Sequence, residues 1–208
     1  MDVSVVLTLA VSLFFILDPF ASIPMFVSVT RGLDENIKKS YANKAVIVAA
    51  ILLFVFMFVG SDLMGIFGVT MSSFRVAGGI ILLMMGVDIV FGLKLSKPGE
   101  DRGAAWVIIA TPILTGPGVI TASVLFSNQY GVFPVILAGL IALLITWMIL
   151  RGSTTIMRIV GEQTLDIVSK VIGLLIVAMG VEYMFKGVSE WIHLYAPDLI
   201  STVIATMM

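Results

Sequence analysis

Two stretches of the sequence resemble each other and decide the fold that we expect: Asp18-Pro-Phe-Ala-Ser-Ile-Pro24 and Thr111-Pro-Ile-Leu-Thr-Gly-Pro117. Each has a polar residue, a proline, a hydroxyl residue three positions after that proline, and a second proline; the stretches lie 93 positions apart. A second match, at an offset of 94, joins Gly79-Ile-Ile-Leu-Leu-Met-Met-Gly-Val-Asp88 to Gly173-Leu-Leu-Ile-Val-Ala-Met-Gly-Val-Glu182. Two matches at nearly one offset indicate that the chain consists of two related halves.

The composition indicates a membrane protein. Hydrophobic residues make up 60% of the 208 positions and charged residues only 12%, whereas about a quarter of the residues of a soluble domain are charged. We therefore expect an all-α integral protein of the plasma or bacterial inner membrane. The net charge of −1, with few and scattered basic residues, gives no indication of nucleic-acid binding.

The residue types present also limit the chemistry. The chain has no cysteine, which excludes disulfides, thiolate metal sites and cysteine nucleophiles. His193 is the single histidine, so a multi-histidine metal cluster is excluded too, and we expect neither a metal site nor a cofactor. Zinc-binding His-Glu motifs and Gly-x-Ser-x-Gly elbows are missing, which argues against an enzyme.

Six apolar segments are long enough to cross a bilayer: roughly 3–30, 41–60, 71–91, 106–128, 132–150 and 168–187. Three spans in each half is an odd number, so the second half enters the membrane from the opposite face and the repeats are inverted. We divide the one transmembrane domain into a first three-helix repeat (1–92), a cytoplasmic connection (93–105), a second, inverted repeat (106–187) and an external interfacial tail (188–208).

The basic residues predict the orientation. Ten of the twelve Lys and Arg residues flank the connections after the first, third and fifth spans, and only Arg75 and Lys186 lie at the opposite ends. By the positive-inside rule these connections face the cytoplasm and both termini lie outside. Asp2 stands where a signal peptide carries basic residues, so we expect the segment after it to remain as the first span.

The proline pairs predict that the first and fourth spans are broken helices. Proline removes a backbone hydrogen bond and clashes with the preceding turn, and backbone groups freed in a bilayer must be satisfied by protein or by a water-filled cavity. Asp18 and Thr111 stand where an N-cap belongs, each followed by a proline at the first helical position, which is a favoured arrangement. Each span is therefore expected to consist of two half-helices.

These breaks predict a binding site. A helix N-terminus attracts anions, so two of them meeting at the repeat interface would suit a carboxylate. Hydroxyl groups and closely approaching glycine backbone add polar contacts, from Ser22, Thr115, Thr121, Gly116 and Gly118. Asp18 adds the negative charge that an ammonium group or a coupling cation needs, and buried membrane carboxylates are usually functional. An amino acid fits this zwitterion site.

Two further acids are ambiguous. Asp88 and Glu182 lie near the ends of their spans, at opposite faces as inversion requires. We favour structural pairing or interfacial solvation over a role as gates. Gly78, Gly79 and Gly86 are expected to allow close helix packing.

The sequence resembles the MarC family of six-span membrane proteins over nearly its whole length. The resemblance rests on the Asp-Pro-x-x-x-Ile-Pro stretch, on Phe74-Arg75-Val76-Ala77-Gly78-Gly79-Ile80 and on Thr115-Gly116-Pro117-Gly118; many members have Asn-Pro in the first motif. It implies uptake of small neutral amino acids such as glycine and alanine, driven by a cation gradient, as in the SnatA-type transporters. It also implies that the site comprises the motif residues, Asp18, Pro19, Ala21, Ser22 and Pro24 with Thr115, Gly116, Pro117 and Gly118, beside Thr111 and Thr121.

Several functions stay open at this stage. The first hypothesis is a secondary transporter of small neutral amino acids, coupled to Na⁺ or H⁺, with alternating access around a midplane site. The same scaffold could export amino acids or other small metabolites, and a channel is the third hypothesis. The sequence leaves the coupling ion, the direction and the oligomeric state undetermined.

Overall fold

The computed structural model describes residues 2–30, 32–92 and 117–196, and every regular element in these ranges is an α-helix. The helices in chain order are α1 (Val3–Leu17), α2 (Pro19–Val29), α3 (Glu35–Ile66), α4 (Met71–Phe91), α6 (Pro117–Tyr130), α7 (Val132–Arg151), α8 (Ser153–Val160) and α9 (Glu162–Tyr195). The predicted all-α fold is confirmed for this part of the chain.

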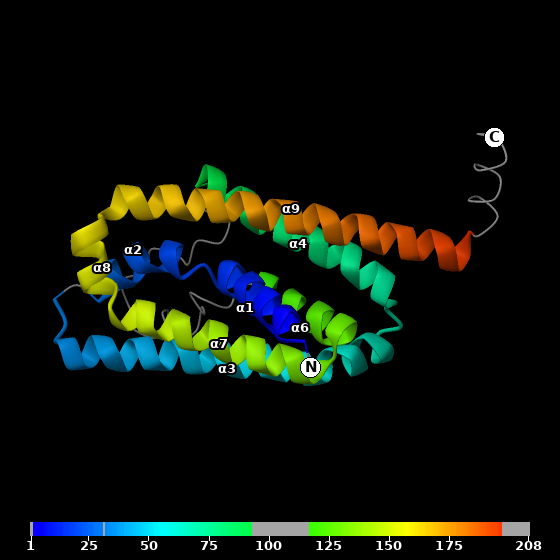
Figure 1. Ribbon diagram of the computed structural model, residues 1–208, viewed down its shortest axis with the longest axis horizontal. Helices are drawn as coiled ribbons and strands as arrows, with labels where there is room; N and C mark the ends of the chain where they lie inside the picture. The colour runs from blue at the N-terminus through cyan, green and yellow to red at the C-terminus, as the bar shows by residue number, and fades with distance from the viewer. Residues whose placement is uncertain (1, 31, 93–116, 197–208) are drawn as a thin grey trace.

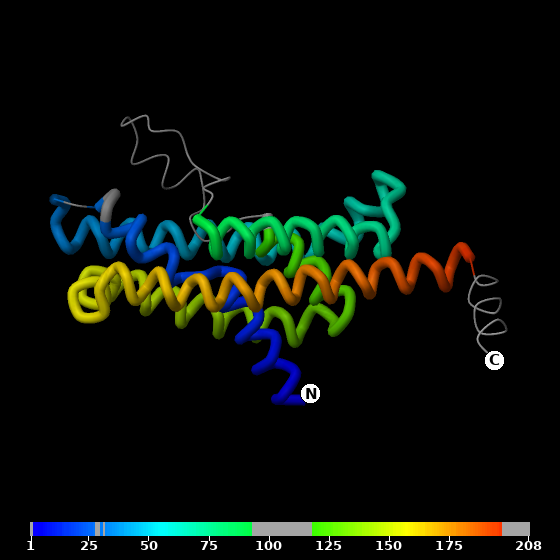
Figure 2. Tube along the Cα trace, turned by 90° about the horizontal axis from the view of Figure 1, so that it is seen from above, coloured from blue at the N-terminus to red at the C-terminus, as the bar shows by residue number. Residues whose placement is uncertain are grey.

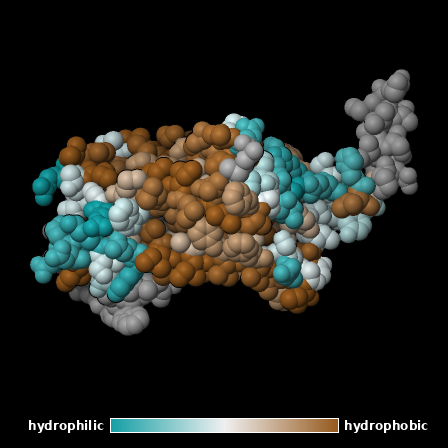
Figure 3. All heavy atoms as spheres, turned by 60° about the horizontal axis from the view of Figure 1, so that its bottom comes forward, coloured by the Kyte–Doolittle hydropathy of each residue, from teal (hydrophilic) through white to brown (hydrophobic). Residues whose placement is uncertain are grey.

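Five helical segments of the described chain are long and apolar enough to cross a membrane: residues 3–27, 35–66, 71–91, 132–151 and 162–195. The sixth expected span, 106–128, lies partly outside the described residues, and α6 covers its second part. Figure 3 shows a broad apolar surface with hydrophilic residues toward both ends of the molecule, as expected for a protein that spans a bilayer.

Two of these helices are longer than the sequence predicts. At 1.5 Å per residue, the 32 residues of α3 extend about 48 Å, beyond a hydrocarbon core of roughly 30 Å. Helix α9 continues to Tyr195, so the predicted boundary at residue 187 is not a helix end. The polar residues after 187 suit a helix in the interface, and the helix ends two residues before Pro197, where the ring restricts the preceding backbone.

The connection between α7 and α9, which follows the fifth predicted span, contains a further helix. Its first part forms α8, whose N-terminal Ser153 is buried while Arg158, Ile159 and Val160 are exposed. Gly161 has a φ of 81°, and this left-handed conformation, which glycine adopts without strain, separates α8 from α9. Helix α8 contacts α2, α7 and α9 and covers one end of the bundle (Figure 1).

The helices form a bundle in which α4 and α9 lie side by side along their length (Figure 1). Helix α7 packs against α1 and α3, and α6 packs against α3, α7 and α4. Figure 2 shows that α1 is inclined to the rest of the bundle and that the chain changes direction between α1 and α2. The beginning of α1 and the end of α9 both lie in the right half of Figure 1, whereas α8 and the connection from α2 to α3 lie at the left end.

Glycines bring α4 and α9 into backbone contact. A Cβ atom on Gly79 would lie 2.5 Å from the Gly180 carbonyl oxygen, and one on Gly180 would lie 2.6 Å from that of Gly79. Gly86 and Gly173 face each other in the same way, at 2.6 and 3.0 Å. A step forward along α4, from 79 to 86, matches a step backward along α9, so the two helices are antiparallel. The expected packing role of Gly79 and Gly86 is confirmed.

Candidate functional site

The first membrane span breaks at Asp18. This residue has φ 37° and ψ 68°, and it is the one non-glycine residue with a positive φ in the described ranges. Its N–H donates to the carbonyl oxygens of Phe14 and Phe15, at 3.2 and 3.1 Å, and so ends α1. A left-handed conformation costs an L-residue about 1–2 kcal/mol, although aspartate tolerates it better than most. Such strain inside a membrane span is a reason to look for function there.

The same residue begins α2. Asp18 Oδ1 accepts a hydrogen bond from the Ala21 N–H at 3.2 Å, which is the geometry of an N-cap, and Pro19 occupies the first helical position. The predicted break and N-cap are therefore present. Pro24 lies inside α2, which continues past it to Val29, so the interruption occurs at the first proline of the pair and not between the two.

The carboxyl group of Asp18 is buried and only half satisfied. The residue is 3% exposed, and Oδ2 has no hydrogen bond of normal geometry to any of the described residues. In the part of the chain that the structure describes, the ion pairs involve other carboxylates. A buried polar atom without a partner loses its hydration without compensation.

Ser169 on α9 lies beside this carboxyl group. The residue is 4% exposed, yet its Oγ, like Asp18 Oδ2, lacks a hydrogen bond of normal geometry. Neighbouring Lys170 pairs instead with Asp166 at 2.6 Å. Helices α2 and α9 are in contact, so the α1–α2 break faces the last helix of the second half. Ser169 is not among the site residues predicted from the sequence.

The beginning of α6 lies close to the α1–α2 break. A Cβ atom on Gly118 would lie 3.5 Å from Ile16 Cγ2, two residues before Asp18, and 3.2 Å from Leu82 Cδ2 of α4. Thr121 is buried and packs its methyl group over Gly78, where a Cβ atom would be 2.2 Å away. Gly118 is thus placed at the expected close approach, but to side chains of α1 and α4.

The other predicted site residues lie in α2, at the start of α6, or outside the described residues. The Ser22 hydroxyl donates to the Asp18 carbonyl oxygen at 3.0 Å, so its proton is already engaged in α2. Ala21 is exposed, while Pro19 is buried and Pro24 partly buried. Pro117 is the first residue of α6. Thr111, Thr115 and Gly116 lie outside the described residues.

A partly buried ion pair joins α4 to α9 far from Asp18 along the chain. The Arg75 guanidinium forms an ion pair with Glu190; the Arg75 side chain is 11% exposed and that of Glu190 is 42% exposed. Arg75 Nε has no hydrogen-bond partner in the part of the chain that the structure describes. With the repeat offset of 94, Arg75 corresponds to Ser169, so both halves carry a polar residue at this position. Comparison of the halves would have related Ser169 to Arg75 in the sequence.

The two ambiguous acids, Asp88 and Glu182, both have partners. Glu182 pairs with Lys186 at 3.2 Å, which supports the structural interpretation of this residue, and Asp88 also takes part in a polar contact. The described residues contain no group of three or more His, Asp or Glu side chains arranged to hold a metal ion.

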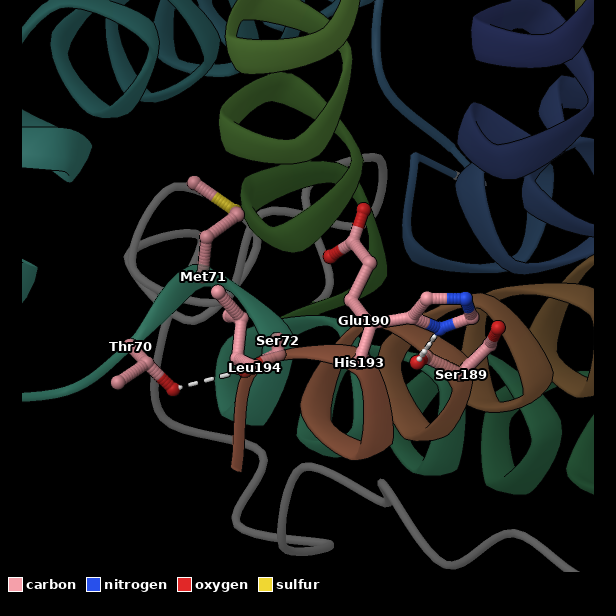
Figure 4. Close-up of a pocket in the computed structure, with 7 residues that line it drawn as sticks. All are labelled: Thr70, Met71, Ser72, Ser189, Glu190, His193 and Leu194. Carbon is pink, nitrogen blue, oxygen red and sulfur yellow. Dashed lines mark hydrogen bonds between the residues drawn. The ribbon is translucent and has the colours of Figure 1, made fainter. Parts of the chain in front are cut away.

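Asp18 lines neither of two open pockets in the described part of the chain. One, of about 510 Å³, is formed by Thr70, Met71 and Ser72 at the start of α4 together with Ser189, Glu190, His193 and Leu194 at the end of α9 (Figure 4). In it, the His193 ring bonds to the Ser189 carbonyl oxygen at 2.8 Å. The other, of about 690 Å³, runs between α1, α6 and α9 and includes Phe15, Phe126 and Tyr183. Its lining contains no predicted site residue.

Comparison with known proteins decides the family. The model of the MarC family of integral membrane proteins matches residues 3–192. The chain belongs to the MarC family. This match identifies the MarC chain as an integral membrane protein.

Relatives of this MarC family chain occur in archaea and bacteria. The UPF0056 membrane protein MJ1677 of Methanocaldococcus jannaschii is 32% identical over 85% of this chain and 92% of its own length. A UPF0056 membrane protein of Archaeoglobus fulgidus is 29% identical over 86% and 90%. The UPF0056 inner membrane protein YhgN of Escherichia coli K12 is 26% identical over 89% and 97%. No solved structure matches this chain.

Proposed function

We propose that this MarC family protein is a secondary transporter of small neutral amino acids, of the glycine and alanine class, driven by a gradient of Na⁺ or H⁺. The observation that carries the proposal is Asp18: a carboxylate buried at the break between two half-helices of a membrane span, with Oδ2 unsatisfied. Ionisable groups inside membrane proteins are costly and mark substrate or ion pathways.

The chemistry of the break matches a zwitterion. The α2 N-terminus provides N–H groups and a partial positive charge, while Asp18 provides a negative charge at the same place. Discontinuous helices with such ends form the substrate and ion sites of many secondary transporters. The closeness of Gly118 at the start of α6 to Ile16 before the break supports a site shared by both halves.

We further propose that the two halves are inverted three-helix repeats that rock against each other. The glycine contacts support this symmetry: displacing Gly79 and Gly86 by the repeat offset of 94 gives Gly173 and Gly180, so the pair 79–180 is transformed into the pair 86–173. A two-fold axis between α4 and α9 has this effect. Exchange of conformations between the halves would then convert an outward-open into an inward-open state.

The test is transport by the purified protein in proteoliposomes. We expect labelled alanine or glycine to accumulate under an imposed Na⁺ or H⁺ gradient, and Asp18→Ala to abolish accumulation. Ser127→Ala, which removes a buried hydroxyl that bonds only the Val124 carbonyl, serves as the matched control and should transport normally. Absence of accumulation of every small amino acid under both gradients would contradict the proposal.

The direction of physiological transport needs a separate measurement. Counterflow with labelled substrate on either side of the membrane distinguishes an importer from an exporter of amino acids or other small metabolites. Saturable flux that depends on the gradient separates both from a channel.

A further inference from the structure

We propose that Asp18 Oδ2 and Ser169 Oγ together bind a monovalent cation, which is either the ammonium group of the substrate or a free sodium ion. This inference rests on the proposed transport function and adds Ser169 of α9 to the site as the second ligand.

The two oxygens of the Asp18 carboxyl group have different roles. Oδ1 already accepts the Ala21 N–H, so it serves the N-terminus of α2. Oδ2 has no hydrogen bond of normal geometry within ranges 2–30, 32–92 and 117–196, although the residue is 3% exposed. A carboxylate can accept about four hydrogen bonds or ligand contacts, so most of the accepting capacity that this group has left is on Oδ2.

A second observation, on Ser169, does not depend on the N-terminus of α2. Ser169 comes from a different helix and from the other half of the chain, and it is 4% exposed with its Oγ unpartnered. It lies next to the Asp18 carboxyl group. Neither oxygen has a hydrogen bond of normal geometry within the described residues, so the hydration that both lose on burial is poorly compensated. A group that contacts both would remove that penalty.

The neighbouring basic residues indicate the sign of the charge that the ligand carries. Lys170, the basic residue next to Ser169, is already paired with Asp166 at 2.6 Å, and Arg75 is paired with Glu190. A carboxylate only accepts, and a serine hydroxyl that donates its proton to the carboxylate still offers the lone pairs of its oxygen, so the ligand that suits the pair is a cation. An ammonium group donates to both oxygens, and a sodium ion takes lone pairs from both, as oxygen-lined transporter sites do.

Placing the cation between α2 and α9 has a consequence for transport. The ligand would join the break in the first half to the last helix of the second half, and α9 in turn contacts α4 through its glycines. Binding would therefore act on the interface along which the two halves are proposed to move.

The experiment measures thermal stabilisation of the purified full-length protein in detergent by three ligands. Sodium chloride replaces choline chloride at constant ionic strength; alanine supplies an ammonium group; propionate has the same carboxylate and lacks that group. Variants are Ser169→Ala, Ser169→Thr, Asp18→Asn and the control Ser127→Ala.

We expect the wild type to be stabilised either by sodium without any amino acid or by alanine but not by propionate, and these two results identify the source of the cation. In Ser169→Ala the half-saturating concentration of that ligand should rise about tenfold to a hundredfold, because one partner of a charged contact is lost. Ser169→Thr keeps the hydroxyl and should restore most of the affinity, and Asp18→Asn should abolish the response.

Two results would overturn the inference: Ser169→Ala indistinguishable from the wild type and from Ser127→Ala, or stabilisation by propionate equal to that by alanine with no response to sodium. The proteoliposome assay keeps the two proposals apart. Alanine transport that is unaffected by Ser169→Ala retains the transport function and removes the cation site. Sodium binding that depends on Asp18 and Ser169, in a protein that transports no amino acid, retains the cation site and contradicts the transport function.

Discussion

Gly79 and Gly180 lie backbone to backbone, each with its α-carbon against the carbonyl oxygen of the other. They belong to different halves of the chain, and small residues at such positions let membrane helices approach closely. The contact fixes the register of α4 against α9, and any side chain at either position must push the helices apart.

Alanine at these glycines should destabilise the protein. A methyl group on Gly79 would lie 2.5 Å from a backbone oxygen that cannot move aside, and overpacking of this kind costs about 1–3 kcal/mol. Gly79→Ala and Gly180→Ala are therefore expected to lower the melting temperature in detergent. Gly65→Ala is the control, since a Cβ atom there meets nothing within 4 Å; a decrease in the control as large as in the variants would refute the packing argument.

Removing the acid of the Arg75–Glu190 pair should cost more than removing the base. Glu190→Gln leaves a guanidinium that is 11% exposed without its partner, and an unsatisfied buried charged group costs about 1–3 kcal/mol or more. Arg75→Met leaves Glu190, which is 42% exposed and can be solvated by water, while the methionine replaces the apolar stem. Thermal unfolding of the two variants measures the difference, and equal losses would show that the pair is solvated on both sides.

Glycine at position 18 should separate the conformation of the break from its charge. The φ of 37° is free of strain for glycine, and replacing an N-cap residue by glycine costs only a few tenths of a kcal/mol. Asp18→Gly is expected to match or exceed the wild type in thermal stability and to lose gradient-driven uptake. Uptake retained by this variant would mean that the carboxylate is not part of the site.

The orientation can be measured directly because the chain contains no cysteine. Single-cysteine variants Ser4→Cys and Lys39→Cys place thiols at the two ends of the bundle, next to the beginnings of α1 and α3. From the distribution of basic residues, a membrane-impermeant maleimide added to intact cells should label Ser4→Cys, and label Lys39→Cys only after the membrane is permeabilised. The reverse pattern would invert the proposed topology.

Much of the fold and part of the site could be predicted from the sequence. Hydropathy identified the membrane helices, and Pro19 after an N-cap residue identified the break, because these signals are local. The end of α9 at Tyr195 could not be predicted from hydropathy, since a helix can continue into the interface where its residues are no longer apolar.

The partners of the buried polar groups required the structure. Ser169 meets Asp18 only because α9 packs against α2, and Arg75 meets a residue 115 positions away. Arg75 stood out in the sequence as an exception to the distribution of basic residues and as part of the Phe74–Ile80 stretch, and neither signal identified its partner. Such contacts depend on the packing of helices from different halves, which no local pattern encodes.

The reciprocal glycine contact has a consequence for how such a chain could arise. An interface in which residue i of one partner meets residue j of the other, and j meets i, is isologous and therefore complementary to itself. A polypeptide containing one half alone would carry that surface, and two copies inserted in opposite orientations would assemble the same helix pair. Duplication and fusion of a gene for a dual-topology homodimer would yield the present single chain, with α4 and α9 as the former subunit contact.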